Sequence, residues 1–219
     1  MKPRLLPLGD SSLLIRFGDE IEPALNQRVH DLDALLREDQ IPGVIETIPA
    51  YATLLLHYDP LVLTYAQAAD WVNAELTRVS TTVIRKPRRI EVPVRYGGEY
   101  GPDLDFVASQ HHISAQEVIR LHTGCEYTVY MMGFTPGFAY MGRLDERIAT
   151  PRLETPRVKV KAGSVGIAGA QTGIYPIDSP GGWRLIGWTS MPLFDLNTEP
   201  PFLFSPGDTV RFVNEAHDA

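Results

Sequence analysis

The stretch that decides the fold reads GFTPGFAYMG at 133–142, TPRLETPRVKVKAGSVGIAG at 150–169 and QTGIYPIDSPGGW at 171–183. Residues 133–187 hold 10 of the chain's 18 glycines, mixed with prolines, aromatic residues and cations. Glycine permits positive φ angles and close approach of the backbone, whereas proline fixes φ and removes a hydrogen-bond donor. The mixture therefore predicts tight turns between short strands. Two interpretations remain open, an exposed functional surface and a β-barrel with many turns.

The sequence around this stretch predicts the barrel. Short apolar runs separated by turn residues predict strands at 125–131, 157–161, 166–168, 183–187 and 208–213. A further strand is predicted at 90–94, and we expect two short helices between it and the others, one opened by Gly101-Pro102-Asp103 and one by the capping-box pattern Ser114–Glu117. Many short strands with helices only at the entry are typical of a closed or nearly closed barrel.

The first 85 residues follow a different pattern. Predicted strands cover 4–8, 12–17, 44–48 and 53–57, and predicted helices cover 21–36 and 64–79. The strands form two hairpins, and a helix follows each hairpin. An antiparallel sheet with both helices on one face would bury the apolar side of every element. We therefore expect a small α+β unit of ferredoxin-like type.

The basic, proline-interrupted segment Arg85–Arg89 marks the predicted domain boundary. The predicted fold class is α+β, with a ferredoxin-like α/β domain at 1–85 followed by a β-barrel domain at 86–219. Twenty basic residues against 27 acidic ones give a formal charge of −7, which argues against non-specific binding of nucleic acid. The basic segment is more typical of a solvated linker than of a nucleic-acid site.

The composition predicts a soluble, cytoplasmic protein with no membrane partner. The single Cys125 allows no internal disulfide, which favours a reducing compartment. No apolar run approaches the ~18 residues of a membrane span. Pro7, Gly9 and Asp10 interrupt the first apolar run, so we expect no secretory signal.

Four cations in the sequence PRLETPRVKVK are candidates for chemistry. Arg152 and Arg157 each follow a proline, which stiffens the segment that carries them. Strand alternation would turn Arg157, Lys159 and Lys161 to one face and the two valines between them to the other. A row of cations suits a carboxylate or a phosphate. The alternative is a solvated barrel face on which the cations pair with nearby acids, namely Glu154, Asp145 or Glu146.

Backbone amides beside this row could add to an anion site. The sequence AGSVG at 162–166 places Gly163, Gly166 and the Ser164 hydroxyl next to the cations, where the amides would form an anion nest. Gly163 is equally typical of a barrel corner or a bulge. The chain contains neither a P-loop nor a dinucleotide GxGxxG pattern, so it shows no self-contained nucleotide site.

Further polar residues lie among turns near the expected barrel mouth, where Gln171, Tyr175 and Ser179 would contact a substrate. Turn hydrogen bonds and core packing are the alternatives for them. His122 is a candidate acid–base group, although a histidine at a helix end also satisfies backbone carbonyls. No GxSxG, HExxH or paired-cysteine pattern is present, so the chain by itself lacks a complete active site.

Long ordered motifs resemble those of one protein family. They are PVRYGGEYGPDLDFVA at 93–108, VYMMGFTPGFAYMG at 129–142, PRLETPR at 151–157 and AGSVGIAGAQTGIYPIDSPGGW at 162–183. With DSSLLIRFG at 10–18, they resemble the 5-oxoprolinase B-subunit family, formerly called allophanate hydrolase subunit 1, which includes the antikinase KipI. The resemblance implies a small α/β domain followed by a cyclophilin-like barrel. Where the family usually has a proline, this chain has Lys161.

The resemblance implies ATP-dependent opening of 5-oxo-L-proline to L-glutamate, carried out together with subunits A and C. It implies ATP bound with the partner subunit, Mg²⁺ only as the counter-ion of ATP, and no metal site on this chain. On this hypothesis the catalytic residues are Arg152, Arg157 and His122, and the residues that contact ATP are Gly163 and Gly166. The substrate-binding residues are Lys159, Ser164, Gln171, Tyr175 and Ser179.

Two other functions remain open. A KipI-like protein would bind a sensor histidine kinase through the exposed barrel face and inhibit its autophosphorylation. A prolyl isomerase, which the barrel suggests, would need an apolar proline pocket and a matching arginine, and the sequence does not locate them.

Overall fold

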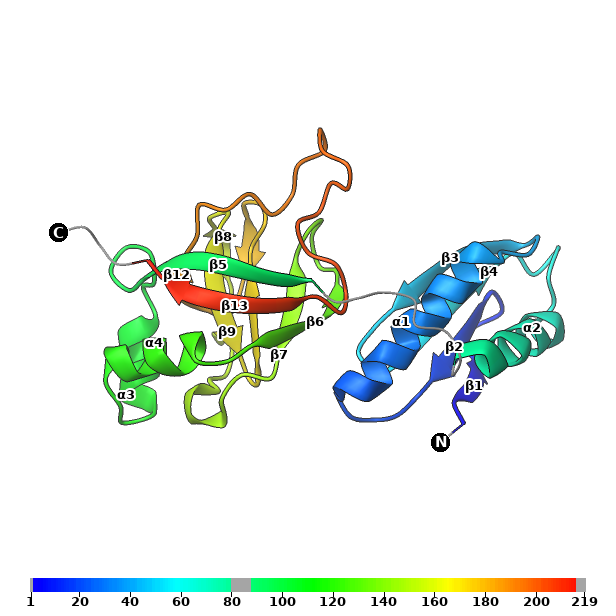
Figure 1. The fold of residues 1–219 in the computed structure, drawn as a ribbon, viewed down its shortest axis with the longest axis horizontal. Coiled ribbons are helices and arrows are strands. Elements are labelled where there is room, and N and C mark those ends of the chain that lie inside the picture. Colours follow the sequence, from blue (N-terminus) through cyan, green and yellow to red (C-terminus); the bar gives the residue numbers. More distant parts are fainter. Residues whose placement is uncertain (1, 80–87, 216–219) are drawn as a thin grey trace. The chain divides into compact units, whose positions relative to one another are not determined.

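The computed structural model describes residues 2–79 and 88–215 and divides the chain into two compact units, residues 1–86 and 87–219 (Figure 1). The predicted boundary segment Arg85–Arg89 lies mostly outside the described residues. Among the described residues, no helix has the length and apolar character that crossing a membrane requires.

The first unit contains two hairpins, each followed by a helix. Its elements are β1 (Arg4–Pro7), β2 (Ser12–Arg16), α1 (Pro23–Glu38), β3 (Val44–Pro49), β4 (Thr53–Tyr58) and α2 (Tyr65–Arg78). The strands form an antiparallel sheet in the order β1-β2-β4-β3. Both helices begin where the local sequence favours a start, at Pro23 and at the capping box of Thr64 and Gln67. The predicted hairpins and helices are confirmed.

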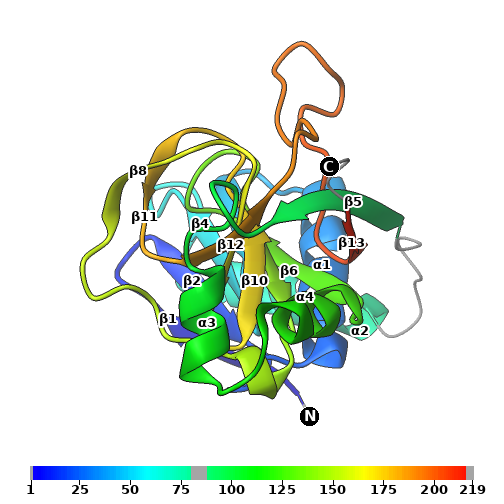
Figure 2. The same ribbon diagram turned by 90° about the vertical axis from the view of Figure 1, so that its left-hand side faces the viewer.

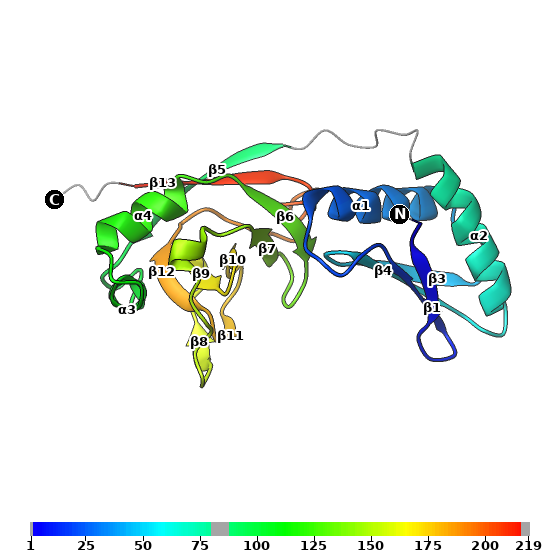
Figure 3. The same cartoon turned by 90° about the horizontal axis from the view of Figure 1, so that it is seen from below.

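One apolar core joins the sheet of this unit to both helices. The inward-facing pairs Leu13–Leu56 and Ile15–Leu54 lie across β2 and β4 and are fully buried. They pack in one cluster with residues of α1 and α2, so both helices cover the same face, as predicted (Figure 3). The ferredoxin-like topology is not confirmed. The elements run ββαββα, whereas a ferredoxin-like domain runs βαββαβ.

The second unit is a closed barrel, as predicted. Its strands are β5 (Arg89–Tyr96), β6 (Tyr127–Met132), β7 (Ala139–Gly142), β9 (Ser164–Ala168), β10 (Gln171–Ile174), β12 (Arg184–Trp188) and β13 (Thr209–Asn214). Around the barrel they follow the order β10-β7-β6-β13-β5-β12-β9, and β10 pairs with β9 to close it. Among these described strands, only the β5–β13 pair is parallel. The likeness to cyclophilins stays a prediction.

Two helices and a separate two-stranded sheet complete this unit (Figure 2). Helices α3 (Leu104–Gln110) and α4 (Ala115–Thr123) pack against each other beside the barrel. The Ser114 hydroxyl accepts a hydrogen bond from the Glu117 amide at 3.1 Å and caps α4 as its sequence predicts. Strands β8 (Arg157–Val160) and β11 (Ser179–Gly181) pair with each other outside the barrel, and both lie within the glycine-rich stretch 133–187.

Candidate functional site

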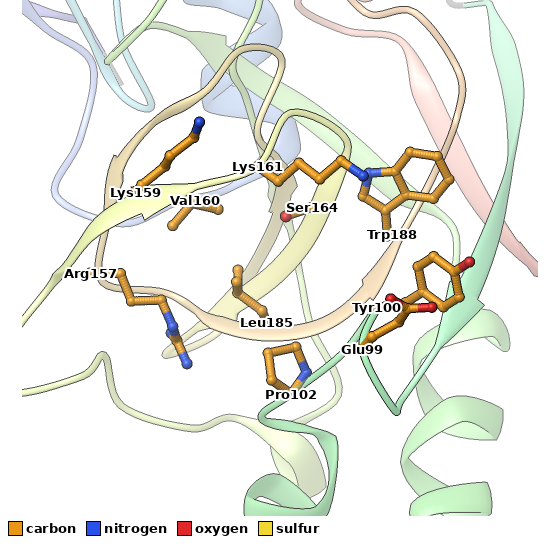
Figure 4. A pocket seen from close by; sticks show the side chains of 10 residues that line it. All are labelled: Glu99, Tyr100, Pro102, Arg157, Lys159, Val160, Lys161, Ser164, Leu185 and Trp188. Atoms are coloured by element: carbon orange, nitrogen blue, oxygen red, sulfur yellow. The ribbon is translucent and has the colours of Figure 1, made fainter.

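A cavity of about 310 Å³ lies between the β8 segment, strands β9 and β12 and the turn before α3 (Figure 4). We call it the Lys161 pocket. Its lining residues are Glu99, Tyr100, Pro102, Arg157, Lys159, Val160, Lys161, Ser164, Leu185 and Trp188. Three of the four predicted cations therefore gather around one cavity.

Arg157 enters this pocket already paired with an acid. Its guanidinium donates to Asp103 Oδ1 at 2.8 Å, and the other oxygen of Asp103 accepts from the Leu185 amide at 2.6 Å. Asp103 is only 7% exposed. Because a buried carboxylate needs a charged partner and hydrogen bonds, Arg157 primarily stabilises Asp103 and the turn that leads into α3.

Lys159 is also paired, although on the surface. Its ammonium lies 2.8 Å from Asp178 Oδ2, and both side chains are exposed. The hydrogen bond with Asp178 raises the pKa of Lys159, and the same contact lowers the pKa of Asp178. The predicted partners Glu154, Asp145 and Glu146 were wrong for Arg157 and Lys159, because the fold brings Asp103 and Asp178 to them instead.

The predicted alternation along β8 holds only in part. Val158 is 91% exposed and Val160 is buried, so the two valines do not share one face. Arg157 pairs with Gly181, and Val160 pairs with Ser179. Between these two pairs the chain advances three residues along β8 but only two along β11, so the register shifts. Such a bulge breaks the two-residue period of a strand.

Lys161 differs from the two cations before it, because it forms no ion pair with any described residue. Its ammonium lies 4.9 Å from the ring centre of Trp188, a cation–π contact. Trp188 is held in place by a 2.8 Å hydrogen bond from its Nε1 to the Ala162 carbonyl and by the stacked ring of Tyr100. The hydroxyl of Ser164 lies on the wall of the same pocket (Figure 4).

The predicted anion nest is contradicted by the backbone hydrogen bonds. The amides of Ala162, Gly163 and Ser164 donate to Asp178 Oδ1, the Tyr175 carbonyl and the Lys161 carbonyl, so none of these three is left for an anion. Gly163 has a φ of +86°, and a side chain there would collide with the Thr189 carbonyl. Gly163 is therefore a corner of the barrel, and Gly166 is a buried residue of β9.

A second cavity, of about 290 Å³, has aromatic walls, and we call it the Arg152 pocket. Its lining residues are Phe134, Phe138, Tyr140, Arg152, Pro156, Tyr175, Pro180, Gly181, Gly182 and Trp183. Arg152 lies 5.8 Å from the ring centre of Trp183. The two predicted arginines thus line different pockets. The pockets are neighbours, because Pro156 lines the Arg152 pocket and the next residue, Arg157, lines the Lys161 pocket.

The predicted site residues divide between these cavities and the interior. Tyr175 lies in the Arg152 pocket, where burial raises the pKa of its hydroxyl. Gln171 and Ser179 line neither of the two cavities. The Ser179 hydroxyl is buried without a hydrogen-bond partner among the described residues.

His122 lies in the barrel core and is fully buried. Its Nδ1 is 2.7 Å from the Tyr96 hydroxyl, and its Nε2 is 2.8 Å from Thr172 Oγ1, which in turn donates to the Gly166 carbonyl. This chain of hydrogen bonds makes Nε2 the donor and Nδ1 the acceptor of a neutral imidazole. Burial lowers the pKa of His122 to about 3. A side chain so enclosed cannot exchange protons with a substrate in either pocket, which corrects its predicted catalytic role.

Sequence reasoning missed several residues of the two pockets. It interprets Asp103 only as part of a helix start, and it does not single out Trp188 or Tyr100. The aromatic residues of FTPGFAY count there only toward turn composition and the family motif, yet Phe134, Phe138 and Tyr140 form one wall of the Arg152 pocket. Their dense spacing beside glycines was the available signal. Among the described residues, no three His, Cys, Asp or Glu side chains gather closely enough to hold a metal ion.

Comparisons with known proteins show which family the chain belongs to. The family described as the carboxyltransferase domain, subdomain C and D, matches residues 3–204. The 5-oxoprolinase B-subunit of Bacillus subtilis is 45% identical over 217 residues, which cover 94% of this chain and 90% of that protein. The 5-oxoprolinase B-subunit of Haemophilus influenzae is 42% identical over 218 residues, which cover 96% of this chain and 97% of that protein.

A solved structure extends the likeness of fold. The urea carboxylase of Kluyveromyces lactis matches with a TM-score of 0.79 over 99% of this chain and 22% of that chain, at 20% identity. From the family match and the two relatives, the chain belongs to the carboxyltransferase domain family of subdomains C and D and, in it, to the 5-oxoprolinase B-subunit group.

Proposed function

We propose that this chain is a subunit of an ATP-dependent 5-oxoprolinase, which opens 5-oxo-L-proline to L-glutamate together with subunits A and C. Membership of the 5-oxoprolinase B-subunit group supports the proposal. The observation that carries it is the pair of neighbouring pockets, each with one cation that forms no ion pair with a described residue, Arg152 in one and Lys161 in the other.

The reaction needs two anions to be held close together. A five-membered lactam is a stable amide. Transfer of the γ-phosphoryl group of ATP to the lactam oxygen, with ADP leaving, would give an electrophile that water attacks; the ring C–N bond then breaks to free the amine of L-glutamate, and phosphate is released. One cation then binds the carboxylate of the substrate, and another stabilises the phosphoryl group in transfer. Two pockets with one available cation each match this requirement.

The Lys161 pocket fits a phosphate better than a ring. Its available donors are the Lys161 ammonium and the Ser164 hydroxyl, and both bind phosphate oxygens well. Arg157 acts as a positioning residue through Asp103. Because Lys161 replaces a proline that is usual in the family, its contribution is particular to this chain, and the partner subunit supplies most of the ATP site. Mg²⁺ enters only as the counter-ion of ATP.

Reconstitution with the partner subunits tests this function. We expect ATP turnover that depends on 5-oxo-L-proline when the chain is combined with subunits A and C, and none when the chain is omitted or used alone. A complex that assembles but hydrolyses no ATP in response to 5-oxo-L-proline would overturn the proposal. The kinase-inhibitor alternative stays a prediction, and retrieval of a sensor kinase with loss of its autophosphorylation would support it.

A further inference from the structure

The Arg152 pocket combines an available guanidinium with a lining that contains no acid. Arg152 forms no ion pair with any described residue, and it is the single charged residue among those that line this cavity. The Lys161 pocket is different, because Glu99 lines it and Asp103 and Asp178 neutralise two of its cations. A carboxylate entering the Arg152 pocket would therefore meet a guanidinium fork that no acid of the described residues already occupies.

The walls of this pocket are fixed and apolar. Phe138 packs edge-to-face against Tyr175, with ring centres 5.3 Å apart, and against Trp183, with ring centres 5.4 Å apart. All three rings are buried. A side chain at Gly181 would collide with the Tyr175 hydroxyl, so glycine keeps this wall open. Phe134 is 60% exposed and meets both Phe138 and Tyr175 edge-on. The cavity thus offers ring faces and edges to the carbon atoms of a small ring.

We propose that the Arg152 pocket binds the five-membered ring of a small cyclic carboxylic acid, with Arg152 holding the carboxylate and the aromatic walls contacting the ring. The identity of that acid, 5-oxo-L-proline, rests on the proposed function. The assignment goes beyond that function, because it separates the site of the lactam from the Lys161 pocket and removes Arg157 from direct contact with the substrate.

A proline residue within a peptide would offer a similar five-membered ring, without the lactam group and without the charge. The lining of the pocket favours the free acid, because the Arg152 guanidinium gains a charge-assisted, two-point contact only from a carboxylate. A peptide carbonyl would leave the cation without a counter-charge. Proline-containing peptides therefore serve as competitors in the test.

The test measures binding of 5-oxo-L-proline by calorimetry, with the full chain and with the chain assembled with its partner subunits. We expect Arg152→Gln to weaken binding at least about tenfold, which corresponds to about 1.4 kcal/mol. The uncharged amide of 5-oxo-L-proline should bind the unaltered protein more weakly by a similar factor. Arg211→Gln is the matched control, because Arg211 is an exposed barrel arginine outside this pocket, and it should bind as the unaltered protein does.

Four results would overturn the inference. In the first, Arg152→Gln and the unaltered protein bind 5-oxo-L-proline equally well; in the second, the acid and its amide bind equally well. In the third, the acid binds neither the chain alone nor the assembled complex. In the fourth, a prolyl peptide binds and the acid does not. If the complex turns over 5-oxo-L-proline and the Arg152→Gln variant still binds it normally, only this inference is refuted. Arg152-dependent binding in a complex without turnover would refute only the proposed function.

Discussion

The two pockets of the barrel each hold a cation over a tryptophan ring, Arg152 over Trp183 and Lys161 over Trp188, yet the acids around them differ. The Lys161 pocket gathers three cations, but Asp103 and Asp178 neutralise two of them and Glu99 lines the same cavity. The lining of the Arg152 pocket holds one cation and no acid. The number of cations near a cavity therefore does not measure the charge that it offers a ligand, since paired cations are already compensated.

The largest expected effect on stability distinguishes Arg157 from Arg152. Arg157→Met would leave the carboxylate of Asp103 buried without its partner and should lower the free energy of unfolding by roughly 3 kcal/mol. Arg152→Gln should change it by less than about 0.5 kcal/mol, because Arg152 is exposed and forms no ion pair with any described residue. Urea denaturation of both variants measures the difference. Equal stabilities would show that the Arg157–Asp103 pair does not organise the Lys161 pocket.

A smaller effect, dependent on pH, tests whether the barrel core is separate from both pockets. His122 has a pKa of about 3 in the folded chain, below its ordinary value of 6.5, so the unfolded chain binds the extra proton first as the pH falls. The stability contributed by neutral His122 is complete above pH 6.5 and is lost progressively towards pH 3. Between pH 7 and pH 5 the unaltered protein should lose about 2 kcal/mol more than His122→Gln.

Thermal or urea unfolding at several pH values checks this prediction, with His122→Gln as the reference for all other titrating groups. Identical pH profiles for the two proteins would mean that His122 is reached by water and is not sealed in the core. The conclusion that His122 cannot exchange protons with a substrate in either pocket would then lose its support.

The smallest expected effect concerns Lys159. Both side chains of its ion pair with Asp178 are exposed, and solvent screens pairs of this kind so that they add little to stability. Lys159→Met should therefore lower stability less than either of the changes above, and the effect should shrink as salt is added. Denaturation at low and high ionic strength measures it. A large effect that salt does not reduce would show that Lys159 is not a simple surface ion pair and that it contributes to the charge of the Lys161 pocket.

Local patterns predicted the elements of the fold, whereas contacts between distant segments decided the site. The helix that begins at Pro23 and the hairpins of the first unit follow from periodicity and turn residues within short windows. The partner of Arg157 lies 54 positions away, and no spacing rule points from one to the other. The exposure of Val158 depends on a bulge that forms only when β8 meets β11.

Glycine and histidine show the same limit in another form. Gly163 is a special backbone position, as its sequence context predicts, but its amide is engaged by the Tyr175 carbonyl, which only the folded barrel brings near. His122 sits at a helix end in the sequence, and its burial among Tyr96, Thr172 and Phe212 depends on strands far along the chain. Residue type and spacing identified the segment, and packing determined which of its groups remain available.

The central claim is that the two pockets serve different anions, and one steady-state measurement tests it directly. The Michaelis constants for 5-oxo-L-proline and for ATP are determined in the assembled complex for the unaltered chain, Arg152→Gln and Lys161→Met. We predict that Arg152→Gln raises the constant for 5-oxo-L-proline at least about tenfold and leaves that for ATP unchanged, and that Lys161→Met affects only ATP. Changes in the same constant for both variants would contradict the account.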